Sequence, residues 1–417
     1  MHIDDMILVS IDDHVVEPLD MFEKHVPNKW KDLAPKVILD DKGVERWIYR
    51  DRPTGVAGLN AVVSWPPEEW GRDPASYAEM RPAVYDVHDR IDDMNANGIL
   101  ASMCFPTFTG FSAGHISHAK DEVTVGMIQA YNNWHVEDWA GAYPGRFIPI
   151  AILPLWEPAL AVAEIERVAA LGFHSVTMPE LPHIDGLPSY HDIEYWGPVF
   201  AALSDHDMVM NLHIGQGFGA LRLAPDSPID NLMVLAPSVS QLAVQDLLWG
   251  PAMRAYPKLK VALSEGGIGW IPFFMDRSDR HYTNQRWLRR DFGGKLPSEV
   301  FREHVIACYV TDKTSLKLRH DIGIDIIAWE CDYPHSDSLW PDAPEFVLNE
   351  LDAVGASDSD IDKITWQNAC RFLHWDPFAH IPREQATVGA LRAKATDVDI
   401  STRSRKEYAA LYAQRGI

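Results

Sequence analysis

The sequence predicts an α/β fold, a (β/α)8 TIM barrel with a long insertion after its first strand and a helical C-terminal tail. Three observations predict it. Short continuous apolar runs alternate with segments of helical periodicity along most of the chain. The runs have the composition of parallel strands that are covered on both faces. No Gly-rich phosphate-binding motif follows any run, which disfavours the alternative, a doubly wound open sheet.

The first strand is predicted at residues 6–11, and an irregular insertion rich in Pro, Trp and Gly follows over residues 19–83. Inside the insertion, residues 36–40 and 45–49 flank Asp41-Lys42-Gly43 and predict a hairpin. The remaining strands are continuous apolar runs, expected at residues 100–105, 147–153, 175–178, 209–213, 260–264, 305–310 and 324–329. The alternating helices, several of which begin near Pro or end near Gly, are expected at residues 86–97, 122–143, 158–171, 193–206, 238–249, 271–287, 312–319 and 343–351.

These elements make eight strands alternating with eight helices, the pattern of a barrel. We therefore expect one metal-dependent barrel domain over residues 1–376 and a C-terminal extension over residues 377–417. The extension is polar, with a last helix expected near residues 388–395 or 405–413, and we expect it to pack on a neighbouring subunit of a homo-oligomer.

Composition narrows the class of protein. The 417 residues are 47% hydrophobic and 23% charged, as in ordinary globular proteins, and the net charge is −23. This charge disfavours nucleic acid and anionic membrane surfaces as partners. The four cysteines form no C-x-x-C pair, and no N-terminal leader or run of transmembrane length is visible. We expect a cytoplasmic protein with reduced thiols.

The candidate functional residues begin at the first strand, in Asp12-Asp13-His14-Val15-Val16-Glu17. Asp12 and His14 are two residues apart, so on a strand they face the same side, and Glu17 follows as the chain leaves the strand. Two carboxylates and an imidazole at one strand end are the beginning of a metal site.

Three later strand ends also offer ligand-type residues, and in a barrel these ends meet at one face. His213 ends the fifth strand, and Glu265 follows the sixth. Asp332 and His335 follow the eighth. Taken alone, each histidine is more simply a hydrogen-bonded core residue and each carboxylate a member of a salt bridge. Four strand ends that all carry such residues predict a metal centre.

At these residues the sequence resembles the amidohydrolase superfamily, in the branch that includes aminocarboxymuconate-semialdehyde decarboxylase. The resemblance covers nearly the whole chain and implies that Asp12, His14, His213 and Asp332 are metal ligands. Asp12 stands where this family commonly has His, and Glu265 stands where its strand-six His is expected. His335 is then a residue that orients Asp332 or an acid–base group.

Charge suggests a second metal ion. One divalent ion balances the first four ligands, which leaves Glu17 and Glu265 as additional buried carboxylates that need a cation or a proton. With these two additional carboxylates, the sequence resembles the barrel-fold nonheme diiron monooxygenases of the platensimycin and platencin type. That resemblance implies two irons held by all six residues, O₂ as oxidant, an external reductase, and an apolar or acyl-CoA-type substrate. Asp332, His335 and Glu265 are the expected catalytic residues.

The alternative is a hydrolase or nonoxidative decarboxylase with one Zn²⁺ or Mn²⁺. The ion would be held by Asp12, His14, His213 and Asp332. Asp332 would move the proton and His335 would assist it.

Overall fold

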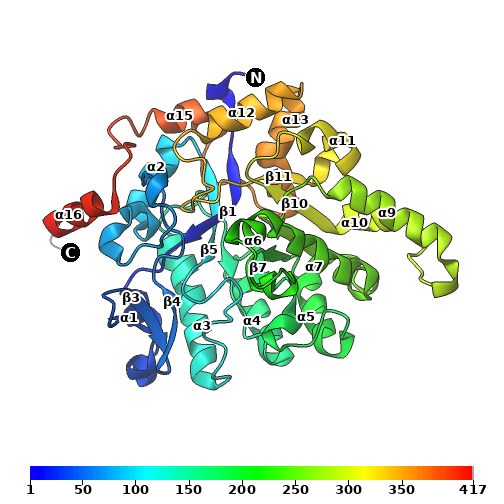
Figure 1. The fold of residues 1–417 in the computed structure, drawn as a ribbon, viewed down its shortest axis with the longest axis horizontal. Coiled ribbons are helices and arrows are strands. Elements are labelled where there is room, and N and C mark those ends of the chain that lie inside the picture. Colours follow the sequence, from blue (N-terminus) through cyan, green and yellow to red (C-terminus); the bar gives the residue numbers. More distant parts are fainter. Residues whose placement is uncertain (416–417) are drawn as a thin grey trace. The chain divides into compact units, whose positions relative to one another are not determined.

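The computed structural model describes residues 1–415 as an α/β protein (Figure 1). It divides into two compact units. The first unit comprises Met1–Pro154, Cys331–Val347 and Asp376–Ile417. The second comprises Leu155–Glu330 and Leu348–Trp375. The predicted strands and helices occur in the expected order along the chain.

The second unit is built on parallel strands in the spatial order β11-β10-β9-β8-β7. Their bounds are β7 Ser175–Met178, β8 Val209–His213, β9 Lys260–Ser264, β10 Val305–Tyr309 and β11 Ile327–Trp329. The strands are buried along nearly their whole length, as their continuous apolar composition predicts. His213, the last residue of β8, lies opposite Ser264, the last residue of β9, so these two strands end together.

Helices alternate with these strands. They are α4 Pro158–Ala170, α5 Ile193–Asp205, α6 Ile229–Leu235, α7 Ser238–Trp249, α8 Ala252–Ala255, α9 Ile271–Asn284, α10 Pro297–His304 and α11 Arg319–Ile322, with α13 Asp358–Asp362 and α14 Asn368–Phe372 later in the chain. Their starts follow local chemistry. Pro158 opens α4, and the Asp192 carboxylate accepts the Tyr195 amide at the beginning of α5.

The first unit holds the first strand, β1 Val9–Val15, paired in parallel with β5 Ala101–Pro106. The register passes from Ser10 opposite Ser102 to Asp13 opposite Cys104, so β1 carries one extra residue at this point. The strand therefore runs further than the predicted residues 6–11 and includes His14. The reason is long-range pairing: the Asp332 amide donates to the Asp12 carbonyl at 2.9 Å, and the His14 amide donates to the Tyr333 carbonyl at 2.6 Å.

Two helices of this unit, α2 Val87–Ala96 and α3 Glu122–Trp134, begin at the capping carboxylates Asp86 and Asp121. A π-helical turn, His135–Trp139, extends α3. The strand predicted at residues 147–153 shrinks to β6, Ile150–Ala151. The Asn132 side chain explains this, because it bonds both the amide and the carbonyl of Ile152 at 3.0 Å and takes the place of a strand partner.

The insertion contains α1 Met21–His25 and a small antiparallel sheet of β2 Lys36–Leu39, β3 Glu45–Tyr49 and β4 Arg52–Val56. The predicted hairpin is confirmed as β2 and β3. Strand β4 was not predicted, because its Pro53 and Gly55 are residues that strands usually lack. In the second unit, the first half of the predicted strand 324–329 is instead a 3-10 turn, Ile324–Ile326.

The C-terminal tail was expected to form one last helix at either of two positions, and it forms a helix at each of them, α15 Val388–Arg392 and α16 Arg405–Arg415. Within the chain itself, Tyr408 of α16 packs with Val62 and Trp65 of the insertion. Helix α12 spans Ala343–Ala353.

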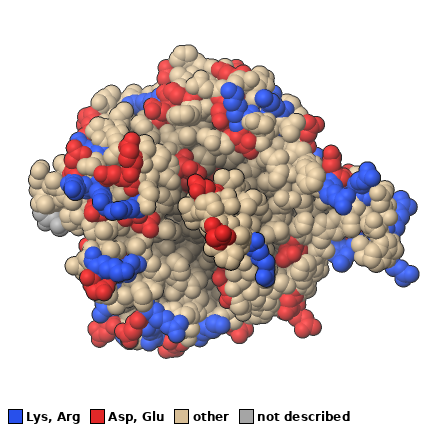
Figure 2. Space-filling model, viewed as in Figure 1, with Lys and Arg blue, Asp and Glu red and all other residues tan. Residues whose placement is uncertain are grey.

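Charge is unevenly distributed over the second unit. Figure 2 shows Lys and Arg side chains gathered where α9 ends, at the right of the view. The cations of this stretch are all exposed: Arg277, Arg280, Arg286, Arg289, Arg290 and Lys295. The surface here is locally basic in a chain of net charge −23.

Within residues 1–415, no single helix is long and apolar enough to cross a bilayer, and only α6 and α7 taken together as a bent pair would meet that length and composition.

Candidate metal centre

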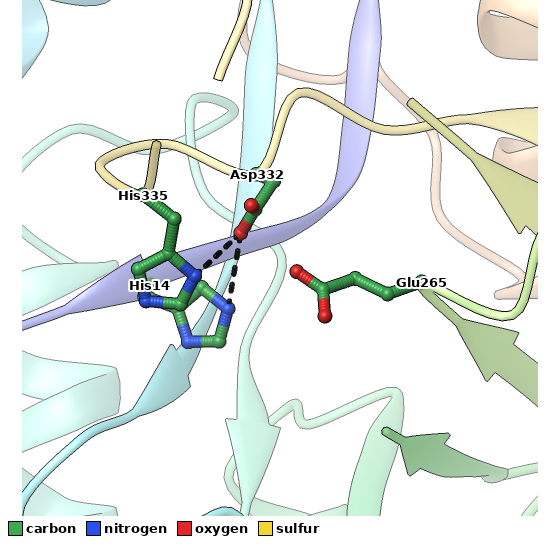
Figure 3. A group of neighbouring side chains, drawn as sticks. All are labelled: His14, Glu265, Asp332 and His335. Atoms are coloured by element: carbon green, nitrogen blue, oxygen red, sulfur yellow. Dashed lines mark ion pairs between the residues drawn. The ribbon is translucent and has the colours of Figure 1, made fainter. Parts of the chain in front are cut away.

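In the first unit, β1 and the segment that follows β11 bring a buried group of imidazoles and carboxylates together. The Nε2 atom of His14 lies 3.6 Å from Oδ1 of Asp12 and 3.4 Å from Oδ1 of Asp332. The three residues are at most 2% exposed. Figure 3 shows Asp332 directed at the His14 ring, with the imidazole of His335 alongside. The same-face placement predicted for Asp12 and His14 is therefore present on β1.

His335 holds Asp332 in place. Its Nδ1 atom lies 2.8 Å from the same Asp332 oxygen, and its ring stacks on that of His14 with 3.9 Å between the ring centres. Asp332 itself has a positive φ of 57°, a conformation that non-glycine residues adopt rarely and that clusters at functional sites. The chain thus accepts backbone strain at Asp332 while a second histidine fixes the direction of its carboxylate.

Asp12 and Asp332 each lie at a distance from His14 that suits two ligands of one divalent cation. Two ligand atoms that each lie about 2.1 Å from one tetrahedral ion are separated by about 3.4 Å. The separations from His14 Nε2 to the two carboxylates are 3.6 and 3.4 Å, which is longer than a good hydrogen bond and close to this ligand–ligand distance. Two carboxylates and a neutral imidazole also balance the charge of one divalent ion.

The second unit contributes its own pair at the ends of β8 and β9. The Nε2 atom of His213 lies 3.7 Å from Oε2 of Glu265. The Nδ1 atom of His213 lies 2.5 Å from the Ile214 carbonyl, so this nitrogen carries the proton and Nε2 keeps the lone pair that a metal ion binds. Glu265 also has a positive φ, 53°, and its amide donates to Oε1 of the buried Glu330 at 3.1 Å.

Glu17 lies outside both groups. Its carboxylate accepts the amides of Thr107 at 3.1 Å and Phe108 at 2.9 Å. Burial raises the pKa of Glu17 to about 7, although both amides favour the charged form. Two backbone donors therefore satisfy the carboxylate without a metal ion. The charge argument for a second iron fails at this residue.

Three residues that the sequence reasoning missed support the first group: Asp13, Arg90 and Tyr333. Asp13 accepts the Tyr333 amide at 3.0 Å and the Ser10 hydroxyl at 3.1 Å. Arg90 donates to the His14 carbonyl at 3.0 Å, lies 3.5 Å from the Asp13 carboxylate and sits 4.0 Å above the Tyr333 ring. Asp13 could have been noticed as the middle residue of the Asp-Asp-His motif. Nothing in the sequence links Arg90 to it.

Glu180 performs a similar task in the second unit. Its two carboxylate oxygens accept the amides of Gly215 at 3.1 Å and Gly217 at 3.0 Å, in the loop directly after His213. Glu180 therefore anchors the beginning of the short 3-10 helix Gln216–Ala220.

Known proteins were compared with the chain. The family model described as amidohydrolase matches residues 27–375. The crystal structure of an amidohydrolase from Mycobacterium avium subsp. paratuberculosis matches with 24% identity and a TM-score of 0.68, over 88% of this chain and 99% of that one. The structure of 2,6-dihydroxybenzoate decarboxylase from Rhizobium matches with 19% identity and a TM-score of 0.58, over 88% and 98% of the two chains. The structure of dihydroxybenzoic acid decarboxylase from Polaromonas sp. JS666 was determined with bound manganese and the inhibitor 2-nitroresorcinol. It matches with 19% identity and a TM-score of 0.58, over 88% of this chain and 96% of that one.

These matches confirm the predicted fold class, a (β/α)8 barrel. They contradict the expected enzyme class. We expected an oxidoreductase, a diiron monooxygenase, and this was wrong: the family model is that of amidohydrolases, and these matched structures are named as an amidohydrolase and as decarboxylases. The error came from counting Glu17 and Glu265 as charges that needed a second iron.

The family model spans more than three quarters of the sequence, and the matched structures cover most of the same chain. The chain belongs to the amidohydrolase family.

Proposed function

We propose that this protein is a nonoxidative decarboxylase that depends on one divalent metal ion, Mn²⁺ or Zn²⁺. The observation that carries the proposal is the buried group of Asp12, His14 and Asp332. Both carboxylates lie at distances from His14 that suit ligands of one ion, and their charge balances it. His213 is the proposed fourth ligand, because in a (β/α)8 barrel the carboxyl ends of the strands face the same end of the barrel. A bound divalent ion would supply positive charge for an anionic substrate.

The substrate class we propose is an aromatic carboxylate. Beside His14, the first unit presents the aromatic rings of Phe105 and Phe111, whose centres lie 6.0 and 5.3 Å from the imidazole. Such a wall suits a flat apolar ring that carries its negative charge at one edge. Two of the matched structures are named as decarboxylases of dihydroxybenzoates, which have this form.

Decarboxylation breaks the bond between the ring carbon and the carboxyl group. The electron pair stays on the ring carbon, CO₂ leaves, and the carbon must take up one proton. Asp332 and His335 share a hydrogen bond of 2.8 Å and are the pair we propose to deliver this proton. No oxidant or reductant is needed, because the proton replaces CO₂ without a change in electron count.

We propose a role for Glu265 that differs from metal binding. Its side chain is 19% exposed, against 3% or less for Asp12 and Asp332. A partly exposed carboxylate can contact substrate or water, whereas a direct metal ligand is usually buried. We propose that Glu265 orients the substrate and that the ion keeps its other ligands when this carboxylate is removed.

The test is CO₂ release from a panel of hydroxybenzoates under argon, with metal-stripped protein and with protein reloaded with Mn²⁺ or Zn²⁺. We expect release only with metal, and incorporation of one deuterium per product in D₂O. The Asp332→Asn variant should be inactive, and the matched control Asp337→Asn, changed at an exposed residue five positions later, should be active. Hydrolysis of esters or amides without CO₂ release would show a hydrolase instead.

A further inference from the structure

Residues of the C-terminal tail reach the metal centre through a path of buried contacts. The path begins at Tyr408 in α16, which is 4% exposed. Its hydroxyl accepts from Nη1 of Arg81 at 3.3 Å, and Nη2 of Arg81 also donates to the Asp399 carbonyl at 2.9 Å. The tail therefore holds the guanidinium group of Arg81 at two points.

 The two partners, Arg81 and Asp399, are 318 positions apart in the sequence, so this contact is purely tertiary.

Arg81 in turn forms an ion pair with Asp93. Its Nε and Nη2 atoms bind the two oxygens of Asp93 at 2.5 and 2.6 Å, a two-point ion pair in which the side chains are 10% and 3% exposed. Burial works to lower the pKa of Arg81, but the Asp93 carboxylate outweighs it and raises that pKa overall. The guanidinium also lies 4.3 Å above the ring of Trp340. Arg81 is therefore fixed on several sides.

Asp93 then holds Tyr333, the residue next to Asp332. The Tyr333 hydroxyl donates to Oδ2 of Asp93 at 2.6 Å. The Tyr333 backbone is bonded at both ends, since its amide donates to Asp13 at 3.0 Å and its carbonyl accepts the His14 amide at 2.6 Å. A displacement of Tyr333 would therefore move both Asp332 and His14.

A second series of hydrogen bonds connects the C-terminal tail with the segment that follows Asp332. The Arg403 amide donates to the Ser64 carbonyl at 2.9 Å, and the hydroxyls of Ser64 and Tyr408 lie 2.5 Å apart. The neighbouring Val63 amide donates to the Pro334 carbonyl at 2.9 Å. Ser64 has a positive φ of 63°, so the tail helps to hold a strained residue in place.

We propose that the tail segment from Asp399 to Tyr408 positions the metal centre, with Tyr408 acting through Arg81, Asp93 and Tyr333. This proposal rests on the proposed function, because it assumes that the site binds a metal ion. Tyr408 is a positioning residue, because it touches neither the substrate nor any proposed ligand.

The test compares full-length wild-type protein with Tyr408→Phe, which removes the hydroxyl and keeps the ring. Tyr412→Phe, one turn further along α16, is the matched control. Hydrogen–deuterium exchange of the peptide that covers residues 331–336 is measured without metal, at denaturant concentrations far below unfolding. We expect about tenfold faster exchange in Tyr408→Phe, the effect of about one lost hydrogen bond, and wild-type exchange in Tyr412→Phe.

The dissociation constant for Mn²⁺, measured by calorimetry, is the second readout. It should rise about tenfold in Tyr408→Phe, as for other residues that orient a ligand from behind. Arg81→Lys keeps the charge and loses the two-point geometry, so it should show the same two changes. Wild-type exchange and wild-type Mn²⁺ affinity in both variants would overturn the proposal. If the wild-type protein binds no Mn²⁺, the proposed function fails, and the exchange comparison alone then decides whether the tail holds this segment.

Discussion

Replacement of Asp332 by Asn should separate a metal ligand from a structural ion pair. Asp332 is buried, and its Oδ1 atom lies 3.4 Å from His14 and 2.8 Å from His335. If these contacts served stability alone, removal of the charge would break a buried pair and cost about 3–5 kcal/mol of unfolding free energy, with or without metal. If Asp332 is a ligand, the metal-free protein carries the buried carboxylates of Asp12 and Asp332 close to the same imidazole, and loss of one charge should cost about 1 kcal/mol or less.

The assay is urea unfolding of the wild type and of Asp332→Asn, each with chelator and with Mn²⁺. At a metal concentration about 100 times the dissociation constant, Mn²⁺ should stabilise the wild type by about 2.7 kcal/mol. It should leave the variant almost unchanged. Equal stabilisation of both proteins by Mn²⁺, or a loss of about 3–5 kcal/mol in the metal-free variant, would refute the reasoning.

Three further changes test other parts of the structure. Glu265→Gln should keep one metal ion per chain and weaken Mn²⁺ binding by less than about tenfold, and loss of the ion would show that Glu265 is an inner ligand. Arg90→Met leaves the buried Asp13 without its cation and removes a donor to the His14 carbonyl, so urea unfolding should show a loss of about 3–5 kcal/mol; a loss below about 1 kcal/mol would contradict this role. Burial raises the pKa of Glu180 from 4.5 to about 7, so its contribution to stability is full below pH 4.5 and is lost as the pH rises through 7. Between pH 5 and pH 8 the wild type should therefore lose about 2 kcal/mol that Glu180→Gln does not lose, and parallel pH profiles would contradict this.

The sequence predicted those parts of the fold that depend on local pattern. The strands Val209–His213 and Lys260–Ser264 and the helix Ser238–Trp249 occur with the predicted bounds, because apolar runs and their flanking residues define them locally. Elements decided by distant partners were harder to predict. Strand β1 reaches Val15 because the chain after Asp332 pairs with it, and β6 is short because the Asn132 side chain occupies its backbone groups.

The same distinction holds for the candidate site. Asp12 and His14 share a face of one strand, and Asp332 and His335 are three residues apart, so local spacing could bring each pair together. The partners of Glu17 are amides 90 and 91 positions away, and no local pattern gives them. Counting carboxylates without knowing those amides turned a satisfied Glu17 into an apparent second metal ligand.

The central claim is that the residues at the strand ends hold one divalent ion. Elemental analysis of protein purified without added metal tests it most directly, with the His14→Ala variant as the comparison. We predict about one manganese or zinc per wild-type chain and almost none in the variant. Wild-type protein with no bound metal, or a variant that retains the metal content of the wild type, would contradict the account.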